Sequence, residues 1–476
     1  MQSIRSATVA SALRGACRQS SHTAFSSLQR SLCAKHVRGL ATTQSQDRNI
    51  LTSRNGFITA VSPASRQQTR NASSSSDELQ KTPLYDLNIA HGGKMVPFGG
   101  YLMPVQYSGL TVSQSHTFTR EHCSIFDVSH MVQRFFTGDS AANFLQRITP
   151  SDIAGLGRHR STLSVFLHAD ESGGIVDDTI ITRLTDTEFY VVTNAACREK
   201  DDKYLEAELE KWNSDKSNGF VKQTQANGYG LVALQGPEAE SILTEALASP
   251  GDGLKNLYFG QSVYQELRLP NGKPSTPLLI SRGGYTGEDG FEISIPGPDV
   301  IPIMETLLAS GPEKVQLAGL GARDSLRLEA GMCLYGHDLD DSTTPVEAAL
   351  SWIIPKERRS ADAGYYGADI IAKQLVPKSK GGSGVLRRRV GLLVEGAPAR
   401  EGAEIVSRDG GAKLGAVTSG CPSPTLGKNI AMGYIQEGFH KSGTEVDVLV
   451  RGRPRKAVVT KMPFVPTKYW KGIAPA

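Results

Sequence analysis

Residues Leu278 to Ile295 read LLISRGGYTGEDGFEISI, and this stretch decides how the middle of the chain folds. The apolar run at its start and the alternation of Phe291, Ile293 and Ile295 at its end are both typical of β-strands. Four glycines within eight residues separate them, so the backbone there can turn tightly or approach a ligand closely. The segment lacks the Lys-Ser/Thr of a phosphate-binding loop and opens no helix, so a nucleotide site is not indicated.

Further strands and helices flank this stretch in a familiar order. Strands are expected at 231–234, 261–267 and 315–317, and helices at 237–247 and 300–308. Together with the strands of the first stretch, the order is β-α-β-β-α-β with an added hairpin. That order predicts a ferredoxin-like domain in the middle of the chain.

Two more helices are predicted from local signals. Apolar residues from Tyr204 to Trp212 recur at helical spacing among charges, which indicates an amphipathic helix over 200–212. The segment Thr344-Pro-Val-Glu347 combines a capping box with Pro at the first helical position. It predicts a helix that begins there and runs through Trp352.

The C-terminal part is rich in short strands. A flexible-looking linker, 376–386, precedes runs at 390–394 and 430–435 and two turns near 409–411 and 451–454. Short strands joined by turns predict an antiparallel barrel or sandwich. We therefore expect an α+β protein with three structured units, at 81–228, 229–375 and 387–476.

Composition narrows the class of protein. No apolar run reaches the eighteen residues of a membrane-spanning helix, and the six cysteines form no CxxC pair or zinc spacing among the 476 residues. The net charge of +4 is uneven: nine Arg and one Lys face the single acid Asp47 within residues 1–70, so the remainder is about −5. A nucleic-acid-binding surface is therefore not indicated.

The first eighty residues have the composition of a targeting segment. They are rich in Arg and Ser and nearly free of acids, and they lack the apolar core of a secretory signal. We predict a mitochondrial transit peptide and flexible linker over 1–80, with cleavage after Leu40 or nearer Ser73 to Ser76. A disordered basic tail is the alternative.

Two neighbouring carboxylates stand inside an apolar strand. The segment Gly173-Gly-Ile-Val-Asp-Asp178-Thr-Ile-Ile181 places Asp177 and Asp178 side by side, and successive strand residues point to opposite faces. At most one of them enters a given cavity, where a buried carboxylate is costly unless it is paired. The alternative is a turn end with both acids in water.

Other polar residues are candidates on weaker grounds. Glu292 alternates with apolar neighbours and faces away from their side, as a site residue or a solvated one. Arg323 offers a fork of donors for a carboxylate or heterocycle edge, unless it forms a surface pair with Asp324 or Glu329. His130 is either a general base or a core histidine bonded to backbone. No hydrolase or metalloenzyme motif is present.

Taken together, eight ordered segments resemble the aminomethyltransferase family of the glycine cleavage system, over essentially Thr82 to Trp470. The matching segments are Thr82–Asp86, His91–Lys94, Phe126–Met131, Gly173–Asp178, Gly284–Gly290, Ala322–Gly331, Thr418–Ser423 and Lys461–Val465.

The resemblance implies a three-domain, cloverleaf-like fold with folate in a central opening, a ferredoxin-like middle domain and a C-terminal β-barrel or jelly-roll. It implies that Asp178 is the catalytic carboxylate near the folate N5/N10 edge. The residues it implies for folate or substrate binding are Glu292, Arg323, Tyr469, Met131, Leu163, Asn194 and Tyr285.

The implied reaction moves a methylene carbon from an aminomethyl-dihydrolipoyl carrier, H-protein, to tetrahydrofolate, in the mitochondrial matrix. The carbon's oxidation level does not change, so the reaction calls for no metal, flavin or nicotinamide. Two rivals remain. One is a folate-binding iron-sulfur assembly factor of the same superfamily, whose Lys-Gly-Cys-x-x-Gly-Gln-Glu segment is replaced here by Gly331-Met-Cys-Leu-Tyr-Gly-His337. The other is a demethylating transferase that acts on a free methylated amine.

Overall fold

The computed structural model describes residues 79–249, 254–409 and 411–472. The predicted transit peptide and both of its candidate cleavage positions lie outside these residues. Within the described residues, no helix is long and apolar enough to cross a membrane.

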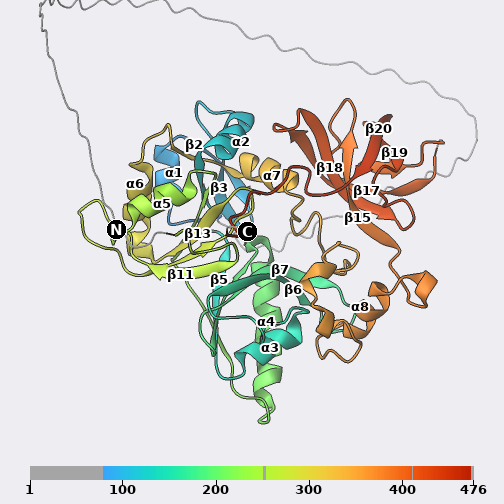
Figure 1. The fold of residues 1–476 in the computed structure, drawn as a ribbon, viewed down its shortest axis with the longest axis horizontal. Coiled ribbons are helices and arrows are strands. Elements are labelled where there is room, and N and C mark those ends of the chain that lie inside the picture. Colours follow the sequence, from blue (N-terminus) through green and yellow to red (C-terminus); the bar gives the residue numbers. More distant parts are fainter. Residues whose placement is uncertain (1–78, 250–253, 410, 473–476) are drawn as a thin grey trace, which may run out of the picture. The chain divides into compact units, whose positions relative to one another are not determined.

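One long mixed sheet runs through the described fold (Figure 1). In spatial order, its strands are β14 (Val315–Leu317), β4 (Cys123–Asp127), β10 (Gly230–Gln235), β13 (Gly290–Ile295), β12 (Leu278–Arg282), β11 (Gln261–Gln265), β6 (Arg160–Leu167), β7 (Ile175–Arg183), β8 (Glu188–Thr193), β5 (Val132–Thr137) and β9 (Lys222–Gln225). A single residue pair, Gln261 with Arg160, joins β11 to β6. The sheet therefore has two halves, and each half has its own core on the face that helices cover.

The first half, β14 to β11, is the predicted ferredoxin-like unit. Helices α5 (Ala239–Ala246) and α6 (Val300–Leu308) pack over one face, where Val232 and Leu234 of β10 join their apolar core. The predicted order of strands and helices is confirmed. One strand is additional, because β4 lies between β14 and β10, parallel to the first and antiparallel to the second. Strand β4 comes from far earlier in the chain, within the unit expected at 81–228. The expected boundaries of the three units stay a prediction.

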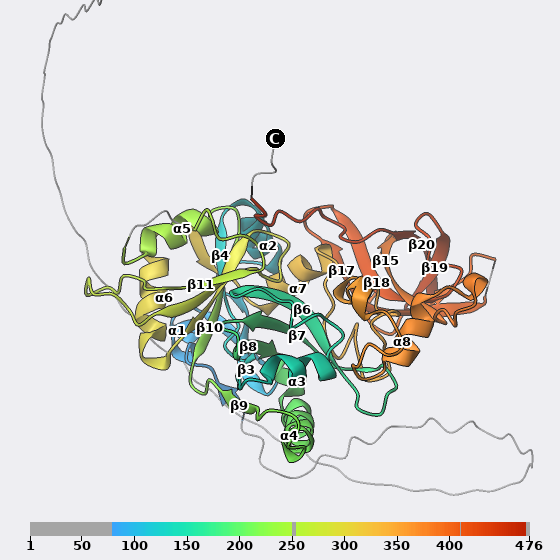
Figure 2. The ribbon, with the colours of Figure 1, turned by 60° about the horizontal axis from the view of Figure 1, so that its bottom comes forward.

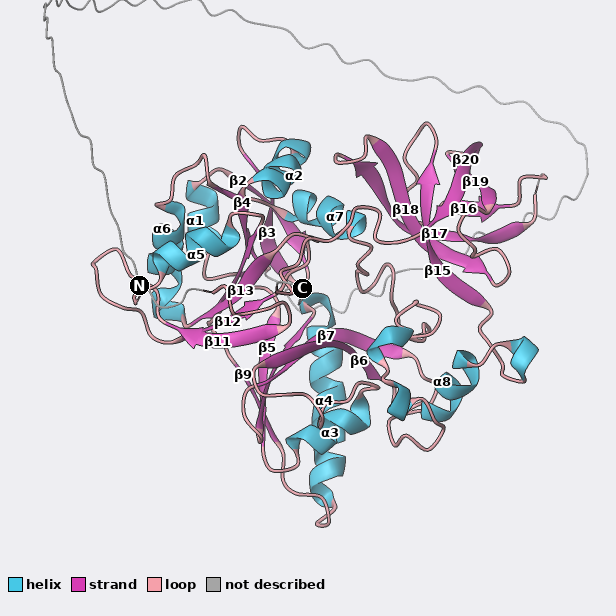
Figure 3. Ribbon diagram, viewed as in Figure 1, coloured by secondary structure: helices cyan, strands magenta, loops and turns pink. Residues whose placement is uncertain are grey.

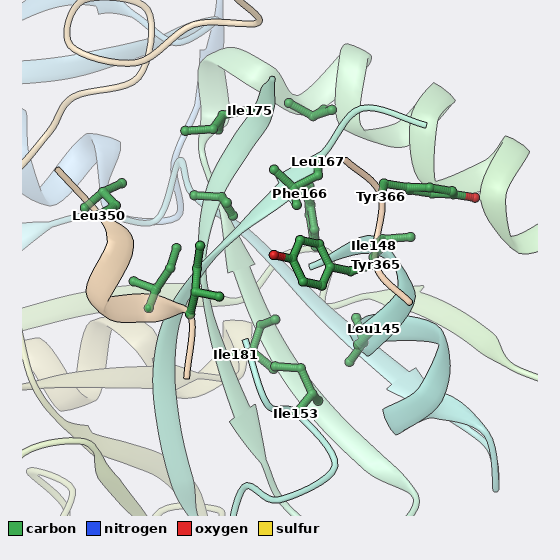
Figure 4. Close-up of a cluster of buried hydrophobic side chains, with 14 of the residues drawn as sticks. Leu145, Ile148, Ile153, Phe166, Leu167, Ile175, Ile181, Leu350, Tyr365 and Tyr366 are labelled. Carbon is green, nitrogen blue, oxygen red and sulfur yellow. The ribbon is translucent and has the colours of Figure 1, made fainter. Parts of the chain in front are cut away.

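The second half, β6 to β9, is covered by α3 (Ala141–Ile148) and α4 (Arg198–Ser214). The amphipathic helix predicted at 200–212 is the centre of α4. Figure 4 shows the core on this face, where Tyr365 and Tyr366 from a later segment lie among Leu145, Ile148 and Phe166. This later segment, which leads into α8 (Ala368–Leu375), completes a core that the sheet and α4 alone would leave open.

The C-terminal strands close into an antiparallel barrel (Figure 3). Around the barrel they are β15 (Arg387–Val394), β18 (Lys428–Gln436), β17 (Lys413–Ser423), β16 (Glu404–Val406), β19 (Glu445–Val450) and β20 (Arg453–Thr460). Val390, Leu392 and Val394 alternate along β15 and point into the barrel core. The predicted barrel and the α+β class are confirmed.

The helix predicted from Thr344 through Trp352 is wrong. The capping box does form, since Thr344 N–H donates to Glu347 at 3.2 Å and Glu347 N–H donates to the Thr344 hydroxyl at 3.3 Å. However, the chain makes one turn only, reaches a φ of +58° at Ala349 and continues as a 3₁₀ turn, Ser351–Ile353. Burial of Val346, Ala348 and Ile353 in the second-half core outweighs helix propagation.

The remaining elements lie beside the first half. A small sheet contains β1 (Gln80–Lys81), β3 (Tyr101–Tyr107) and β2 (Gly93–Phe98), with α1 (Tyr85–Ala90) and α2 (Val112–Glu121) nearby. Helix α7 (Leu320–Glu329) contacts α2, β3 and the barrel strand β17. Figure 2 shows α7 between the barrel and the first half of the sheet.

The inner faces of the two half-sheets share one apolar cluster with α7. Leu231 and Ala233 of β10 meet Tyr190 and Val192 of β8 there, together with Leu326 of α7. These residues alternate with those that face the outer helices, so each strand contributes to two cores. A polar residue on either inner face therefore points toward the place where the two half-sheets and α7 meet, which is called the junction below.

Glu329, at the end of α7, ties several of these units together. Its fully buried carboxylate accepts hydrogen bonds from Arg120 of α2 at 2.8 Å and from the Thr425 hydroxyl, just after β17, at 2.7 Å. Burial opposes its ionisation, but the hydrogen bonds from His116, Ser423 and Thr425 outweigh it and lower the pKa of Glu329 to about 2.

We predict that Glu329→Gln lowers the free energy of unfolding by about 3–5 kcal/mol at pH 7, because Arg120 is left buried with less compensation. The folded-state pKa lies below the unfolded one, so this stabilisation is present above about pH 4.5 and is lost as the pH falls toward 2. Urea unfolding at pH 7 and pH 3 measures it. Glu206→Gln, exposed on α4, is the control. A loss under 1 kcal/mol at pH 7 would contradict the prediction.

Candidate active site

Strand β7 separates the two neighbouring carboxylates onto opposite faces. Asp177 is fully buried on the side of α4, whereas Asp178 is partly exposed. The register shows where Asp178 points: two residues on, Ile180 pairs with Val192, which belongs to the inner apolar cluster. Asp178 therefore faces the junction of the half-sheets, and the alternative with both acids in water is excluded.

Asn194, directly after β8, contacts both carboxylates. Its side-chain NH₂ donates to Asp177 Oδ1 at 2.8 Å and to Asp178 Oδ1 at 2.8 Å, while its backbone N–H donates to Asp177 Oδ2 at 2.9 Å. One amide group thus bridges the two faces of the strand at the point where the sheet ends.

The surroundings of Asp178 disfavour its charged form. Burial and the adjacent Asp177 raise the pKa of Asp178 from 3.8 to about 7, against the opposing hydrogen bond from Asn194. A carboxyl group with this pKa exchanges its proton near neutral pH, which is the range that general acid or base catalysis requires.

Glu292 and Arg323 approach the same junction from other elements. Glu292 pairs with Ala233 across β13 and β10, and Ala233 belongs to the inner cluster, so the Glu292 carboxylate faces inward. Burial raises the pKa of Glu292, and the nearby Arg323 opposes this shift. Arg323 pairs with neither surface partner considered above, since Asp324 binds Arg327 and Glu329 binds Arg120.

Tyr285 links these groups to Asp178. The Arg323 guanidinium lies 4.9 Å from the centre of the Tyr285 ring, and the Tyr285 hydroxyl donates to the Cys333 carbonyl. Burial raises the pKa of Tyr285, and the Asp178 charge adds to this effect, so the two side chains share one environment. The Gly-rich turn makes this placement possible, because a Cβ on Gly284 would lie 1.9 Å from Gln235 Oε1.

The other residues implied for folate or substrate binding lie in different parts of the structure. Met131 packs against the inner cluster, and Leu163 pairs with Ile180 on the face that carries Asp178. Tyr469 belongs to the C-terminal segment and stacks on Phe259 with ring centres 4.2 Å apart. Its neighbour Lys468 donates a backbone N–H to Gly287 at 2.8 Å, so Tyr469 is tied to the Gly-rich turn rather than to β7.

His130 is a buried core residue. Its ring packs edge-on against Phe98 and Tyr101, and its Nδ1 has no hydrogen-bond partner in the described structure. Burial, with Arg323 and Arg198 nearby, lowers the pKa of His130 to about 3. The imidazole is therefore neutral at physiological pH, and its Nδ1 makes no hydrogen bond to the backbone of the described residues.

Sequence reasoning missed two buried charged groups close to the residues of the candidate site. Asp201 is fully buried on α4 beside Asp177, and its signal was available: it stands four residues before the buried Leu205, on the apolar face of the predicted helix. Arg327 lies one turn after Arg323 and binds Asp338 at 2.6 Å and the barrel residue Ser419 at 2.8 Å. The contacts of Arg327 with Asp338 and Ser419 join distant parts of the chain, so only the folded structure reveals them.

Two buried donors among the predicted site residues have no hydrogen-bond partner in the part of the chain that the structure describes. Arg323 Nη1 and the Tyr469 hydroxyl are both buried and unpaired in the described structure. A flat heterocycle with carbonyl oxygens and N–H groups at its edge, such as a pterin, fits this set of Arg donor and Glu292 acceptor. No group of His, Cys, Asp or Glu side chains that could hold a metal ion occurs in the described residues.

Known protein families match the chain over most of its length. The GCVT N-terminal domain matches residues 84–358, and the glycine cleavage T-protein C-terminal barrel domain matches residues 387–466. A probable mitochondrial aminomethyltransferase of Schizosaccharomyces pombe is 48% identical over 87% of this chain and 99% of its own. The mitochondrial aminomethyltransferase of Mus musculus is 46% identical over 85% of this chain and 94% of its own.

A solved structure agrees with these matches. The glycine cleavage system aminomethyltransferase T of Bartonella henselae has a TM-score of 0.72 and 37% identity, over 83% of this chain and all of its own. The predicted family, fold class and transferase activity are thereby confirmed. The chain belongs to the aminomethyltransferase family, the T-proteins of the glycine cleavage system.

Proposed function

We propose that the chain transfers the methylene carbon of an aminomethyl-dihydrolipoyl H-protein to tetrahydrofolate, with Asp178 as the catalytic carboxylate. The products are 5,10-methylenetetrahydrofolate, ammonia and dihydrolipoyl H-protein. The single observation that carries the proposal is the inward-facing Asp178, which has a pKa of about 7 and is hydrogen-bonded by Asn194 at 2.8 Å. It lies in a chain whose relatives are named mitochondrial aminomethyltransferases.

Each inward-facing group has a part in this proposal. Tetrahydrofolate supplies the two nitrogens, N5 and N10, that take up the carbon. Glu292 accepts hydrogen bonds from N–H groups at the pterin edge, and Arg323 donates to its acceptors while Tyr285 holds the guanidinium in place. Met131 and Leu163 supply apolar contacts, and Tyr469 closes the opening from the C-terminal segment.

Asp178 acts on protons and charge. In its ionised form it accepts a proton from the nitrogen that becomes bonded to the carbon, and its negative charge stabilises the positive charge that develops next to it. Asn194 fixes the orientation of the carboxylate. Much of the remaining rate comes from holding two large partners in the reactive geometry. The transferred carbon keeps its oxidation level throughout the proposed reaction.

We also propose that the enzyme works in the mitochondrial matrix on lipoylated H-protein. The Arg-rich, acid-poor N-terminus and the mitochondrial relatives support this location. An assay with aminomethylated H-protein and tetrahydrofolate, followed by ammonia release, tests the substrate. Activity on a free methylated amine alone would favour the demethylating rival, and folate binding without any transfer would favour the iron-sulfur assembly rival.

We predict that Asp178→Asn lowers turnover by about 10² or more, because the amide cannot accept the proton. The amide oxygen still accepts from Asn194, so folding and folate binding remain. The variant should also melt at a higher temperature than the parent at pH 8. The raised pKa means that ionised Asp178 destabilises the fold above about pH 7, and this gain disappears near pH 4. Turnover within threefold of the parent would remove Asp178 from catalysis.

We predict that kcat/KM rises with pH through about 7 and then levels off, because the ionised form of Asp178 is the active one. The free enzyme's pKa governs kcat/KM, so the measurement is an initial-rate profile from pH 5.5 to 9 at low tetrahydrofolate. A profile that is flat below pH 7 would show that the protonation of Asp178 does not limit the reaction.

We predict that Arg323→Lys weakens tetrahydrofolate binding by about tenfold or more, because Lys lacks the planar fork and its stacking on Tyr285. Glu292→Gln should weaken it by a similar factor. Fluorescence titration with tetrahydrofolate measures both. Glu305→Gln, exposed on α6, should bind as the parent does. Equal affinity in all four proteins would contradict the assignment of the pterin site.

A further inference from the structure

A second pair of carboxylates lies directly behind Asp178. Asp177 points from β7 toward α4, and Asp201 points from the first turn of α4 toward β7. Both side chains are fully buried, and each lies within hydrogen-bonding reach of the other. Two ionised carboxylates that meet in a dry interior repel each other strongly, so one proton between them is the stable arrangement.

The hydrogen bonds around the pair are one-sided. Asp177 accepts two bonds from Asn194, through the backbone N–H at 2.9 Å and the side-chain NH₂ at 2.8 Å. Neither oxygen of Asp201 has a hydrogen-bond partner among the donors of the described structure. The buried Arg134 forms its ion pair with Asp202, and its charge favours the ionised form of Asp201 without a hydrogen bond to it. Asp201 therefore meets no donor unless one acid of the pair is protonated, and a single proton between Asp177 and Asp201 supplies the missing hydrogen bond.

We propose that Asp177 and Asp201 share a single proton and act as positioning residues that aim the Asn194 amide at Asp178. The inference rests on the proposed catalytic role of Asp178. An amide side chain can rotate so that its oxygen and nitrogen exchange places, and Asp177 prevents this, because only the NH₂ end can bond to a carboxylate. Both hydrogens of that NH₂ are then used, one on Asp177 and one on Asp178.

The shared proton also sets the charge that Asp178 meets. With one proton the pair carries a single negative charge, held between β7 and α4. The other charged or titratable groups near the pair are Arg134, Lys200, Cys197 and Tyr335. Those near Asp178 are Tyr285, Asp338 and Cys333. Among the groups that act on Asp178, Asp177 exerts the largest charge effect. Moving the negative charge along the pair therefore changes the proton affinity of Asp178.

Two isosteric variants move this charge in opposite directions. In Asp177→Asn, the charge resides on Asp201, farther from Asp178, and the rise of kcat/KM with pH should shift to lower pH by about half a unit or more. In Asp201→Asn, the new amide donates to Asp177, which holds the whole charge beside Asp178, and the rise should shift to higher pH. Glu199→Gln, exposed on α4, should leave the profile in place.

The outcomes separate this inference from the proposed function. Opposite shifts in the two variants support the shared proton. Profiles that coincide with the parent, or a lower melting temperature without any shift, mean that the pair is only structural and overturn the inference, while loss of turnover in Asp178→Asn still supports the catalytic role. Full activity of Asp178→Asn would instead refute the catalytic role itself.

A readout independent of activity covers the case in which a variant turns over too slowly to measure. In Asp178→Asn protein at pH 8, the infrared spectrum should retain the C=O stretch of a buried protonated carboxyl group. That band should disappear when Asp201→Asn is added. If the double variant does not fold, Asp178→Asn/Asp177→Asn serves in its place, because it also removes one acid of the pair. Absence of the band in folded Asp178→Asn would overturn the shared proton.

Discussion

The alternation of side chains along β7 is the constraint on which the site depends. Two adjacent carboxylates cannot share one face of a strand, so Asp177 enters the core below α4 while Asp178 faces the junction of the half-sheets. A one-residue slip of register would exchange them and bury Asp178 against α4. Pairing of β7 with β6 along most of its length, and with β8 from Thr179 onward, prevents that slip.

The junction costs stability, and the surrounding structure offsets this cost. Holding the pKa of Asp178 near 7 instead of 3.8 disfavours its ionised form by about 4 kcal/mol. Comparable burial affects Glu292 and Arg323, which moderate each other's pKa. The opposite situation holds at Glu329, where hydrogen bonds from α2 and from the barrel favour the charge. Charges that join the units stabilise the fold, whereas the inward-facing ones are the groups that we propose for catalysis and folate binding.

Much of the fold was predictable because local signals and tertiary demands agree. The strands around the Gly-rich turn, the helix over 300–308 and the barrel strands all have periodic patterns that match their burial. The capping box at Thr344 shows the opposite case. Its hydrogen bonds form as predicted, yet the following residues give up the helix to place Val346 and Ile353 in a core supplied by distant segments. The pairing of β4 with β14 likewise joins segments that are far apart in the sequence, and no local pattern predicts it.

For the candidate site, residue type and spacing predicted only some of the residues and contacts. Alternation predicted that one acid of the pair would enter a cavity, and family resemblance, not spacing, selected Asp178. Asp201 was within reach of helical periodicity, since an acid in line with Leu205 must be buried with it, but its partner Asp177 lies across a strand-helix contact that sequence does not encode locally. The two acids meet only in the folded chain, where burial and their mutual repulsion both disfavour two negative charges. In the arrangement that we propose, the strand that turns Asp178 inward thus places an acid behind it, and Asp201 of α4 shares the proton that neutralises one acid of this pair.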